Sequence, residues 1–98
     1  MNRIKVMVVC GFGLGSSMVL RMTLDDVLMN EKIDVETFCS DINVATGENY
    51  DIVFTSQELA YLFEGKHQPT VVIKNFLSKA EILEKGIEPI RRLIGERG

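Results

Sequence analysis

A short glycine-rich segment between a predicted strand and a predicted helix constrains this chain more than any other feature. The segment reads CGFGLGSS over residues 10–17, with glycines at three alternate positions. Residues 4–9 before it form an apolar, β-branched run typical of a buried strand, and an apolar spacing typical of a helix resumes after Ser16 and Ser17. The sequence therefore predicts a strand that ends at Cys10, then a tight loop, then a helix N-terminus.

This arrangement is suited to binding an anion. Glycines at alternate positions let several backbone N–H groups converge, and a helix N-terminus adds unpaired donors and a partial positive charge. The same field favours a thiolate, so we expect the pKa of Cys10 to lie below the value of about 8.5 for a free thiol. The segment thus combines a nucleophile with a phosphoryl-binding loop.

The spacing of the segment excludes two nucleotide-binding motifs. A Walker A loop needs a lysine followed by Ser or Thr, and no lysine lies between Lys5 and Lys32. The dinucleotide motif G-x-G-x-x-G fails because Gly15 comes one position too early.

Cysteine phosphatases use C-x5-R, but the residue six after Cys10 is Ser16. A small cysteine-dependent phosphatase or an arsenate-reductase-like enzyme is the alternative, although its arginine is missing.

The composition is ordinary for one soluble globular domain that spans residues 1–98. The chain is 46% hydrophobic and 26% charged, with a formal net charge of -3. No basic stripe is present, which argues against nucleic acid as the main partner. No run approaches the roughly 18 apolar residues of a membrane helix, so we expect a cytoplasmic protein. Cys39 lies far from Cys10 in sequence, and the two do not form a Cys-x-x-Cys motif. We therefore expect reduced thiols and no metal site. For Cys39 we expect a structural role.

Apolar and turn-forming segments alternate along the chain. We expect strands at about residues 3–9, 33–38, 51–54 and 70–74, and helices at about 16–30, 55–65 and from 78 onwards. Capping boxes that begin at Thr55 and Ser78 mark the starts of the last two helices. Gly86 and Pro89 predict a break or a kink in the last helix near residues 86–88.

Strands that alternate with helices form parallel βαβ units, and right-handed crossovers place the helices on both faces of the sheet. We therefore expect an α/β fold: a single-domain three-layer sandwich with a four-stranded parallel sheet in the order 2-1-3-4 and a phosphatase-like P-loop after the first strand. In this order the connections of the first and third strands leave to opposite sides, so the carboxyl end of the first strand borders the crevice where open α/β sheets bind ligands. The topology and the motif predict the same site.

Other polar residues near the predicted site receive no catalytic role. Asp41 can reach the same rim, but acidic residues are common in turns. Thr55 and Ser56 follow the strand beside the first one, and helix capping already explains them. His67 lies in a predicted surface turn remote from the end of the first strand, so we expect a solvated histidine.

The chain resembles the IIB component of the bacterial phosphotransferase system (PTS), and it is most similar to the ascorbate/galactitol (lactose-like) type. The resemblance lies in a strand near the start of a chain of this size, followed by the segment Cys-Gly-x-Gly-x-Gly-Ser-Ser and an amphipathic helix. The resemblance implies that Cys10 accepts a phosphoryl group from a histidine of the IIA component and passes it to a sugar held by the membrane component IIC. It implies that the phosphate-binding residues are Gly11, Phe12, Gly13, Leu14, Gly15, Ser16 and Ser17. It implies no cofactor, and it places the protein in the cytoplasm, associated with the inner face of the membrane through IIC.

Overall fold

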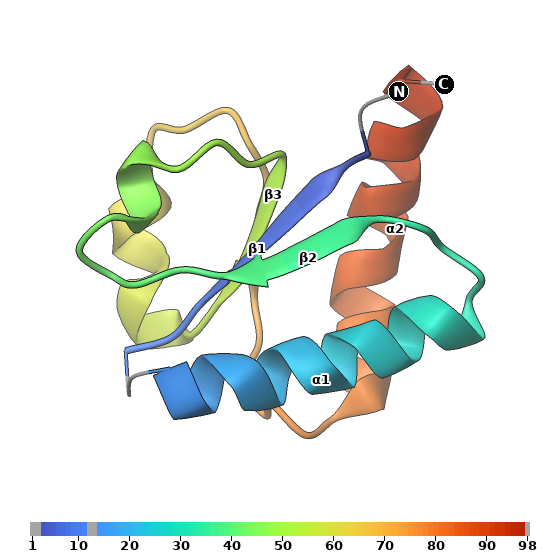
Figure 1. Ribbon diagram of the computed structural model, residues 1–98, viewed down its shortest axis with the longest axis horizontal. Helices are drawn as coiled ribbons and strands as arrows, with labels where there is room; N and C mark the ends of the chain where they lie inside the picture. Colours follow the sequence, from blue (N-terminus) through green and yellow to red (C-terminus); the bar gives the residue numbers. More distant parts are fainter. Residues whose placement is uncertain (1–2, 12–13, 98) are drawn as a thin grey trace.

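The computed structural model describes residues 3–11 and 14–97. Its elements are β1 (Lys5–Val9), α1 (Leu14–Asn30), β2 (Glu36–Cys39), the 3₁₀ helix η1 (Ala45–Gly47), β3 (Ile52–Thr55), the 3₁₀ helix η2 (Gln57–Phe63), β4 (Thr70–Val72) and α2 (Lys79–Arg97). The four strands form one parallel sheet in the order β2-β1-β3-β4 (Figure 1). The four-stranded parallel sheet and its order are therefore confirmed.

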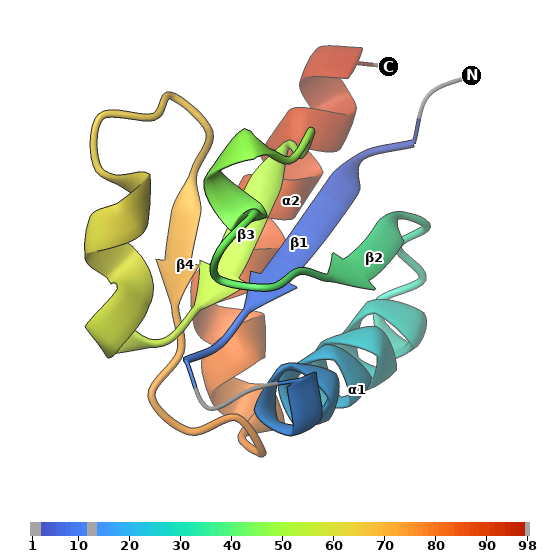
Figure 2. The same cartoon turned by 60° about the vertical axis from the view of Figure 1, so that its left-hand side comes forward.

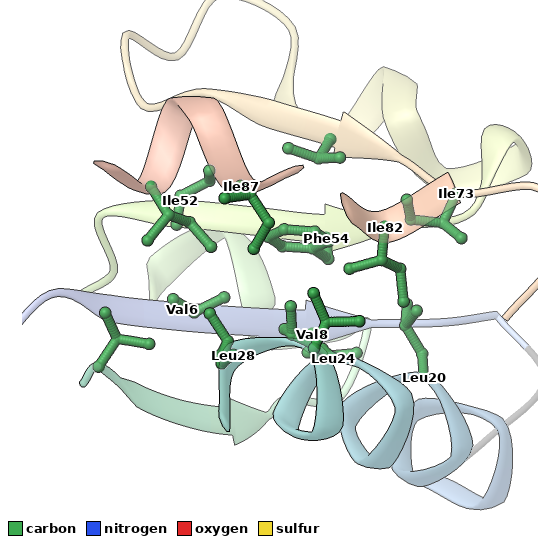
Figure 3. Packing of buried hydrophobic residues seen from close by; sticks show 14 of the residues in the cluster. Val6, Val8, Leu20, Leu24, Leu28, Ile52, Phe54, Ile73, Ile82 and Ile87 are labelled. Carbon is green, nitrogen blue, oxygen red and sulfur yellow. The ribbon is translucent and has the colours of Figure 1, made fainter. Parts of the chain in front are cut away.

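Alternate residues of β1 enter two separate cores. Val6 and Val8 belong to the larger core, and Met7 and Val9 belong to the smaller one. The larger core joins β1 and β3 to both α-helices through Leu20, Leu24, Leu28, Ile52, Phe54, Ile82, Ile87 and Ile90 (Figure 3). The smaller core lies under the two 3₁₀ helices, so α1 and α2 cover one sheet face while η1 and η2 cover the other (Figure 2). Helices on both faces, as expected, explain why β1 is apolar on both sides.

The strand after α1 begins later than the sequence suggests. α1 ends at Asn30, as expected, but β2 begins at Glu36 rather than at residue 33. The backbone N–H of Ile33 donates to the carbonyl oxygen of Leu28 at 2.9 Å, and Lys32 has a φ of 58°. At these residues the backbone N–H groups donate to the last carbonyl groups of α1, so they are not available for pairing with β1.

The element after β3 is a 3₁₀ helix and lacks the capping box expected at Thr55. Thr55 is the last residue of β3, and its buried hydroxyl donates to the carbonyl oxygen of Val9 at 2.7 Å. Ser56 takes the N-terminal capping position instead, without a side-chain hydrogen bond to the helix. The prediction was wrong because the threonine hydroxyl serves the contact between two neighbouring strands.

The last helix is continuous, so the break that the sequence suggested near residues 86–88 is absent from the described residues, while a kink there stays a prediction. α2 runs through Gly86 and Pro89 without interruption. A Cβ atom at Gly86 would lie 2.5 Å from the ring of Phe54, which leaves no space for a larger residue. Gly86 therefore allows the helix to approach the sheet closely, and this packing need explains a glycine that the sequence suggested as a helix breaker.

Candidate active site

Cys10 lies at the carboxyl edge of the sheet, in a pocket of about 150 Å³. The pocket is lined by Cys10, Gly11, Ser17, Ser40, Asp41, Ile42 and Asn43. The pocket has one wall from the end of β1 and the first turn of α1, and a second wall from the loop after β2.

The structure brings together three of the eight predicted site residues. Cys10, Gly11 and Ser17 line the pocket. Gly15 and Ser16 lie in the first turn of α1, whose four residues include no acidic side chain. Leu14 is the first residue of that helix, and residues 12–13 lie outside the part of the chain that the structure describes.

Ser17 is the hydroxyl in direct contact with the cysteine. Its side chain is buried, and it forms a hydrogen bond with the thiol of Cys10. A hydroxyl that donates a hydrogen bond to the sulfur stabilises the thiolate more than the thiol. The structure therefore places Ser17 beside Cys10, and its contact with a phosphoryl group stays a prediction.

The expected low pKa of Cys10 is wrong for this structure. Burial raises the pKa of the thiol to about 11, the hydrogen bond from Ser17 lowers it by less, and the nearby Cys39 raises it further. Cys10 is only 4% exposed and belongs to the larger apolar core, so its thiolate would lose most of its hydration. The sequence motif indicated the donors around the sulfur but not the depth at which the sulfur lies. Cys10 is therefore a neutral thiol near pH 7.

The second wall of the pocket contains polar residues to which sequence reasoning gave no role. Ser40 directly follows β2, and its backbone N–H donates to the carbonyl oxygen of Val8 at 3.0 Å. Asp41 also lines the pocket, and its Oδ1 accepts the backbone N–H of Asn43 at 2.8 Å. The signal that could have found Ser40 is its position directly after the strand that pairs with β1, because such residues share the sheet edge with Cys10.

Cys39 lies closer to Cys10 than its sequence separation suggests. It is opposite Val8 in the pairing of β1 and β2, and it packs against the core that contains Cys10. Burial raises the pKa of Cys39, while the guanidinium of Arg21 lowers it in part. Cys39 is not among the residues that line the pocket, so it provides a natural comparison for the reactivity of Cys10.

The remaining candidates lie elsewhere. His67 is exposed in the segment that precedes β4, which is the opposite end of the sheet from Cys10. Within residues 3–11 and 14–97, no three His, Cys, Asp or Glu side chains are placed to hold a metal ion. In the same residues no helix is long and apolar enough to cross a membrane.

The fold and the pocket together define an α/β domain with a nucleophilic side chain beside a helix N-terminus, at the sheet edge where such domains bind anions. A family model described as "PTS system, Lactose/Cellobiose specific IIB subunit" matches residues 5–85. The chain therefore belongs to this family, and the predicted PTS IIB component is confirmed.

Structural comparison agrees with the family assignment. The chain is similar to the lactose-specific IIB component domain of the phosphoenolpyruvate:carbohydrate phosphotransferase system from Streptococcus pneumoniae, with a TM-score of 0.54 and 13% sequence identity over 99% of this chain and 100% of that chain. At this identity the likeness shows the fold alone. A comparison with curated proteins gives no match. The ascorbate/galactitol type expected from the sequence is not supported, since both findings name lactose or cellobiose.

Proposed function

We propose that this IIB component accepts a phosphoryl group on Cys10 from a phosphohistidine of a IIA component and passes it to a sugar bound by a membrane component IIC. The observation that carries the proposal is a buried cysteine that shares a small polar pocket with the first turn of a helix. Helix N-termini stabilise phosphoryl oxygens with backbone N–H groups, so neither a metal nor a nucleotide is needed. The protein then acts in the cytoplasm, at the inner face of the membrane where IIC lies.

The first step requires the thiol to lose a proton. Because burial raises the pKa of Cys10 to about 11, the thiol is neutral when the donor arrives. As the S–P bond forms and the N–P bond of the phosphohistidine breaks, the leaving histidine nitrogen becomes basic and takes the thiol proton. The reaction thus moves one phosphoryl group and one proton in opposite directions between the two partners.

The second step restores the thiol. A sugar hydroxyl attacks the phosphorus, the S–P bond breaks, and the proton of the hydroxyl balances the thiolate that leaves. The high pKa of the free thiol favours its reprotonation, which makes return of the phosphoryl group to Cys10 less favourable. Lactose and cellobiose are named for the family, and we propose a sugar as the class of the final acceptor.

The pocket also suits transfer more than hydrolysis. Phosphoryl transfer depends chiefly on positioning and on stabilisation of charge. A cysteine phosphatase adds an arginine six residues after the cysteine, and this chain has Ser16 there. Without that guanidinium, a phosphoryl group held on Cys10 lacks the clamp that promotes attack by water. We therefore expect a phosphocysteine that persists until the acceptor arrives.

The test is phosphorylation in a reconstituted system. The protein is incubated with phosphoenolpyruvate, the general phosphocarriers and a candidate IIA component, and its intact mass is measured. We expect the wild type and Cys39→Ser to gain one phosphoryl group and Cys10→Ser to gain none, because a serine hydroxyl is a much weaker nucleophile than a cysteine thiol. Uptake by Cys10→Ser at the wild-type rate would refute the proposal, and rapid hydrolysis of a generic phosphate ester would favour the phosphatase alternative.

A further inference from the structure

Three buried hydroxyl groups have no hydrogen-bond partner within residues 3–11 and 14–97. They belong to Ser40, Tyr50 and Ser56. A buried hydroxyl without a partner destabilises the folded state, so each one needs an explanation. Of the three, Ser40 alone lines the pocket that contains Cys10. Its residue is only 6% exposed, so bulk water does not satisfy it.

The positions of Ser17 and Ser40 differ in a way that points to a bound group. Ser17 forms a hydrogen bond with the sulfur of Cys10, whereas the Oγ of Ser40 forms none with it. A phosphoryl oxygen on a phosphorylated cysteine lies two bonds beyond the sulfur. A hydroxyl in the same pocket that forms no hydrogen bond with the sulfur is therefore suited to an oxygen of the attached group rather than to the thiol.

The backbone of Ser40 is held firmly at this place. Its N–H donates to the carbonyl oxygen of Val8 at 3.0 Å, directly after the last paired residue of β2. Next to it, the carboxylate of Asp41 adds a negative charge to the same wall and is held by the backbone N–H of Asn43. This charge repels a phosphoryl dianion, so a hydroxyl donor in the wall offsets part of the repulsion.

We propose that the hydroxyl of Ser40 donates a hydrogen bond to a phosphoryl oxygen carried by Cys10 and so orients the group in the pocket. Ser40 and Ser17 then act from different walls, one on the phosphoryl group and the other on the sulfur. This inference rests on the proposed function, because it assumes that Cys10 carries the phosphoryl group.

The test compares the three unpartnered hydroxyl groups with one another. Ser40→Ala, Ser56→Ala and Tyr50→Phe each remove one of them, and none should lower the thermal midpoint, because each removes an unsatisfied group. We expect only Ser40→Ala to shorten the lifetime of the phosphocysteine and to slow its formation, by about tenfold for a hydrogen bond to a charged group. Ser40→Thr, which keeps a hydroxyl, should retain most of the lifetime.

A second readout separates failure of this inference from failure of the proposed function. Inorganic phosphate is titrated into wild-type protein and Ser40→Ala, and amide NMR shifts of residues in the pocket are followed. If the wild type takes up no phosphoryl group on Cys10, the proposed function fails and this inference fails with it. If the wild type is phosphorylated, about tenfold weaker phosphate binding by Ser40→Ala supports the role of Ser40. Equal phosphocysteine lifetimes, equal phosphate affinities, or an equal loss in Ser56→Ala would each overturn it.

Discussion

The junction between β1 and α1 can be compared with the junction between β4 and α2, because each connects a parallel strand to the N-terminus of a helix on the same sheet face. Backbone N–H groups at such junctions have no partner within the helix and attract negative charge. Figure 2 shows the two junctions at the same edge of the sheet. They differ in where that negative charge comes from.

At the junction after β4 the charge comes from the chain itself. The carboxylate of Glu81, in the first turn of α2, accepts the backbone N–H groups of Lys74 at 2.8 Å and Asn75 at 2.9 Å and the ammonium of Lys85 at 2.6 Å. Burial acts to raise the pKa of Glu81, but these hydrogen bonds outweigh it and lower the pKa to about 2. The hydroxyl of Ser78 accepts the N–H of Glu81 at 3.1 Å, which forms one half of the predicted capping box, while the N–H of Ser78 donates to the carbonyl oxygen of Asn75 instead of to Glu81. The junction is complete without a ligand.

At the junction after β1, no carboxylate within residues 3–11 and 14–97 accepts backbone N–H groups in this way; Asp41 lines the neighbouring pocket but accepts the backbone N–H of Asn43. The first turn of α1 has no acidic residue, and the third residue of the helix is Ser16, where α2 has Glu81. The neighbouring pocket contains a neutral thiol and an unpartnered hydroxyl. The comparison teaches that one type of junction can serve either as a closed structural turn or as a site left open for an external anion.

The largest expected effect comes from adding a carboxylate to the junction between β1 and α1. Ser16→Glu places a carboxylate at the position that Glu81 occupies in α2. We expect it to slow phosphoryl acceptance by at least about 100-fold, because a like charge repels the incoming dianion, and to keep or raise the thermal midpoint, because an acidic residue suits the first turn of a helix. Ser16→Gln has nearly the same shape without the charge and is the control. Equal rates for the two variants would show that negative charge at this position does not compete with the phosphoryl group.

A second prediction concerns the thiol and its pH dependence. With a pKa raised to about 11, Cys10 should react with an alkylating reagent at least about 100-fold more slowly at neutral pH than a free thiol with a pKa of about 8.5. Its rate should rise with pH until about pH 11. Peptide mass mapping after brief alkylation measures Cys10 and Cys39 in one sample. An inflection for Cys10 below pH 8.5 would restore the low pKa that the sequence motif suggests.

A third prediction concerns removal of the carboxylate charge at the junction between β4 and α2. Glu81→Gln should lower the free energy of unfolding at pH 7 by about 1–2 kcal/mol, because it removes a charged acceptor from several donors, while phosphoryl acceptance by Cys10 stays unchanged. Since the pKa of Glu81 is lowered from 4.5 to about 2, its contribution is fully present above pH 4.5 and is lost as the pH falls to about 2.

Denaturant unfolding across this pH range checks the prediction. The difference between wild type and Glu81→Gln should shrink from pH 5 to pH 2. Glu84→Gln, on the exposed side of the same helix, should behave like the wild type. A constant difference at all pH values would mean that the ionised carboxylate is not what stabilises this junction.

The smallest expected effect is at Gly15. No described atom outside its local neighbourhood lies within 4 Å of a Cβ built there, and its φ is not in the left-handed region, so the fold does not require glycine. Gly15→Ala should raise the free energy of unfolding by about 0.5–1 kcal/mol, and it should slow phosphoryl acceptance if approaching oxygens need the space. Gly95→Ala, another helical glycine in open space, should stabilise the protein without affecting acceptance. A lower thermal midpoint for Gly15→Ala would contradict this account.

The sheet and the place of the site could be predicted because local signals determine them. The apolar run before Cys10 and the three glycines after it mark β1 and its junction, and the alternation of strands and helices gives the strand order. The site residues that were missed depend on tertiary contacts. Ser40 becomes part of the pocket because β2 pairs with β1, as the predicted strand order requires, but its burial beside Cys10 depends on the surrounding chain and not on local sequence.

The corrections have the same physical origin. Thr55 looks like a helix cap in sequence, but its hydroxyl meets a carbonyl group of β1. Gly86 looks like a helix breaker, but it makes space for Phe54. The pKa of Cys10 depends on a burial that no motif encodes. In each case a contact between segments far apart in the chain outweighs a local preference.

The measurement that tests the central claim most directly is phosphorus NMR of the protein after phosphorylation by its IIA partner. The account predicts one protein-bound resonance with the chemical shift of an S-phosphorylated cysteine, present in wild type and in Cys39→Ser and absent in Cys10→Ser. A resonance typical of phosphohistidine, which would place the group on His67, or one that persists in Cys10→Ser would contradict it.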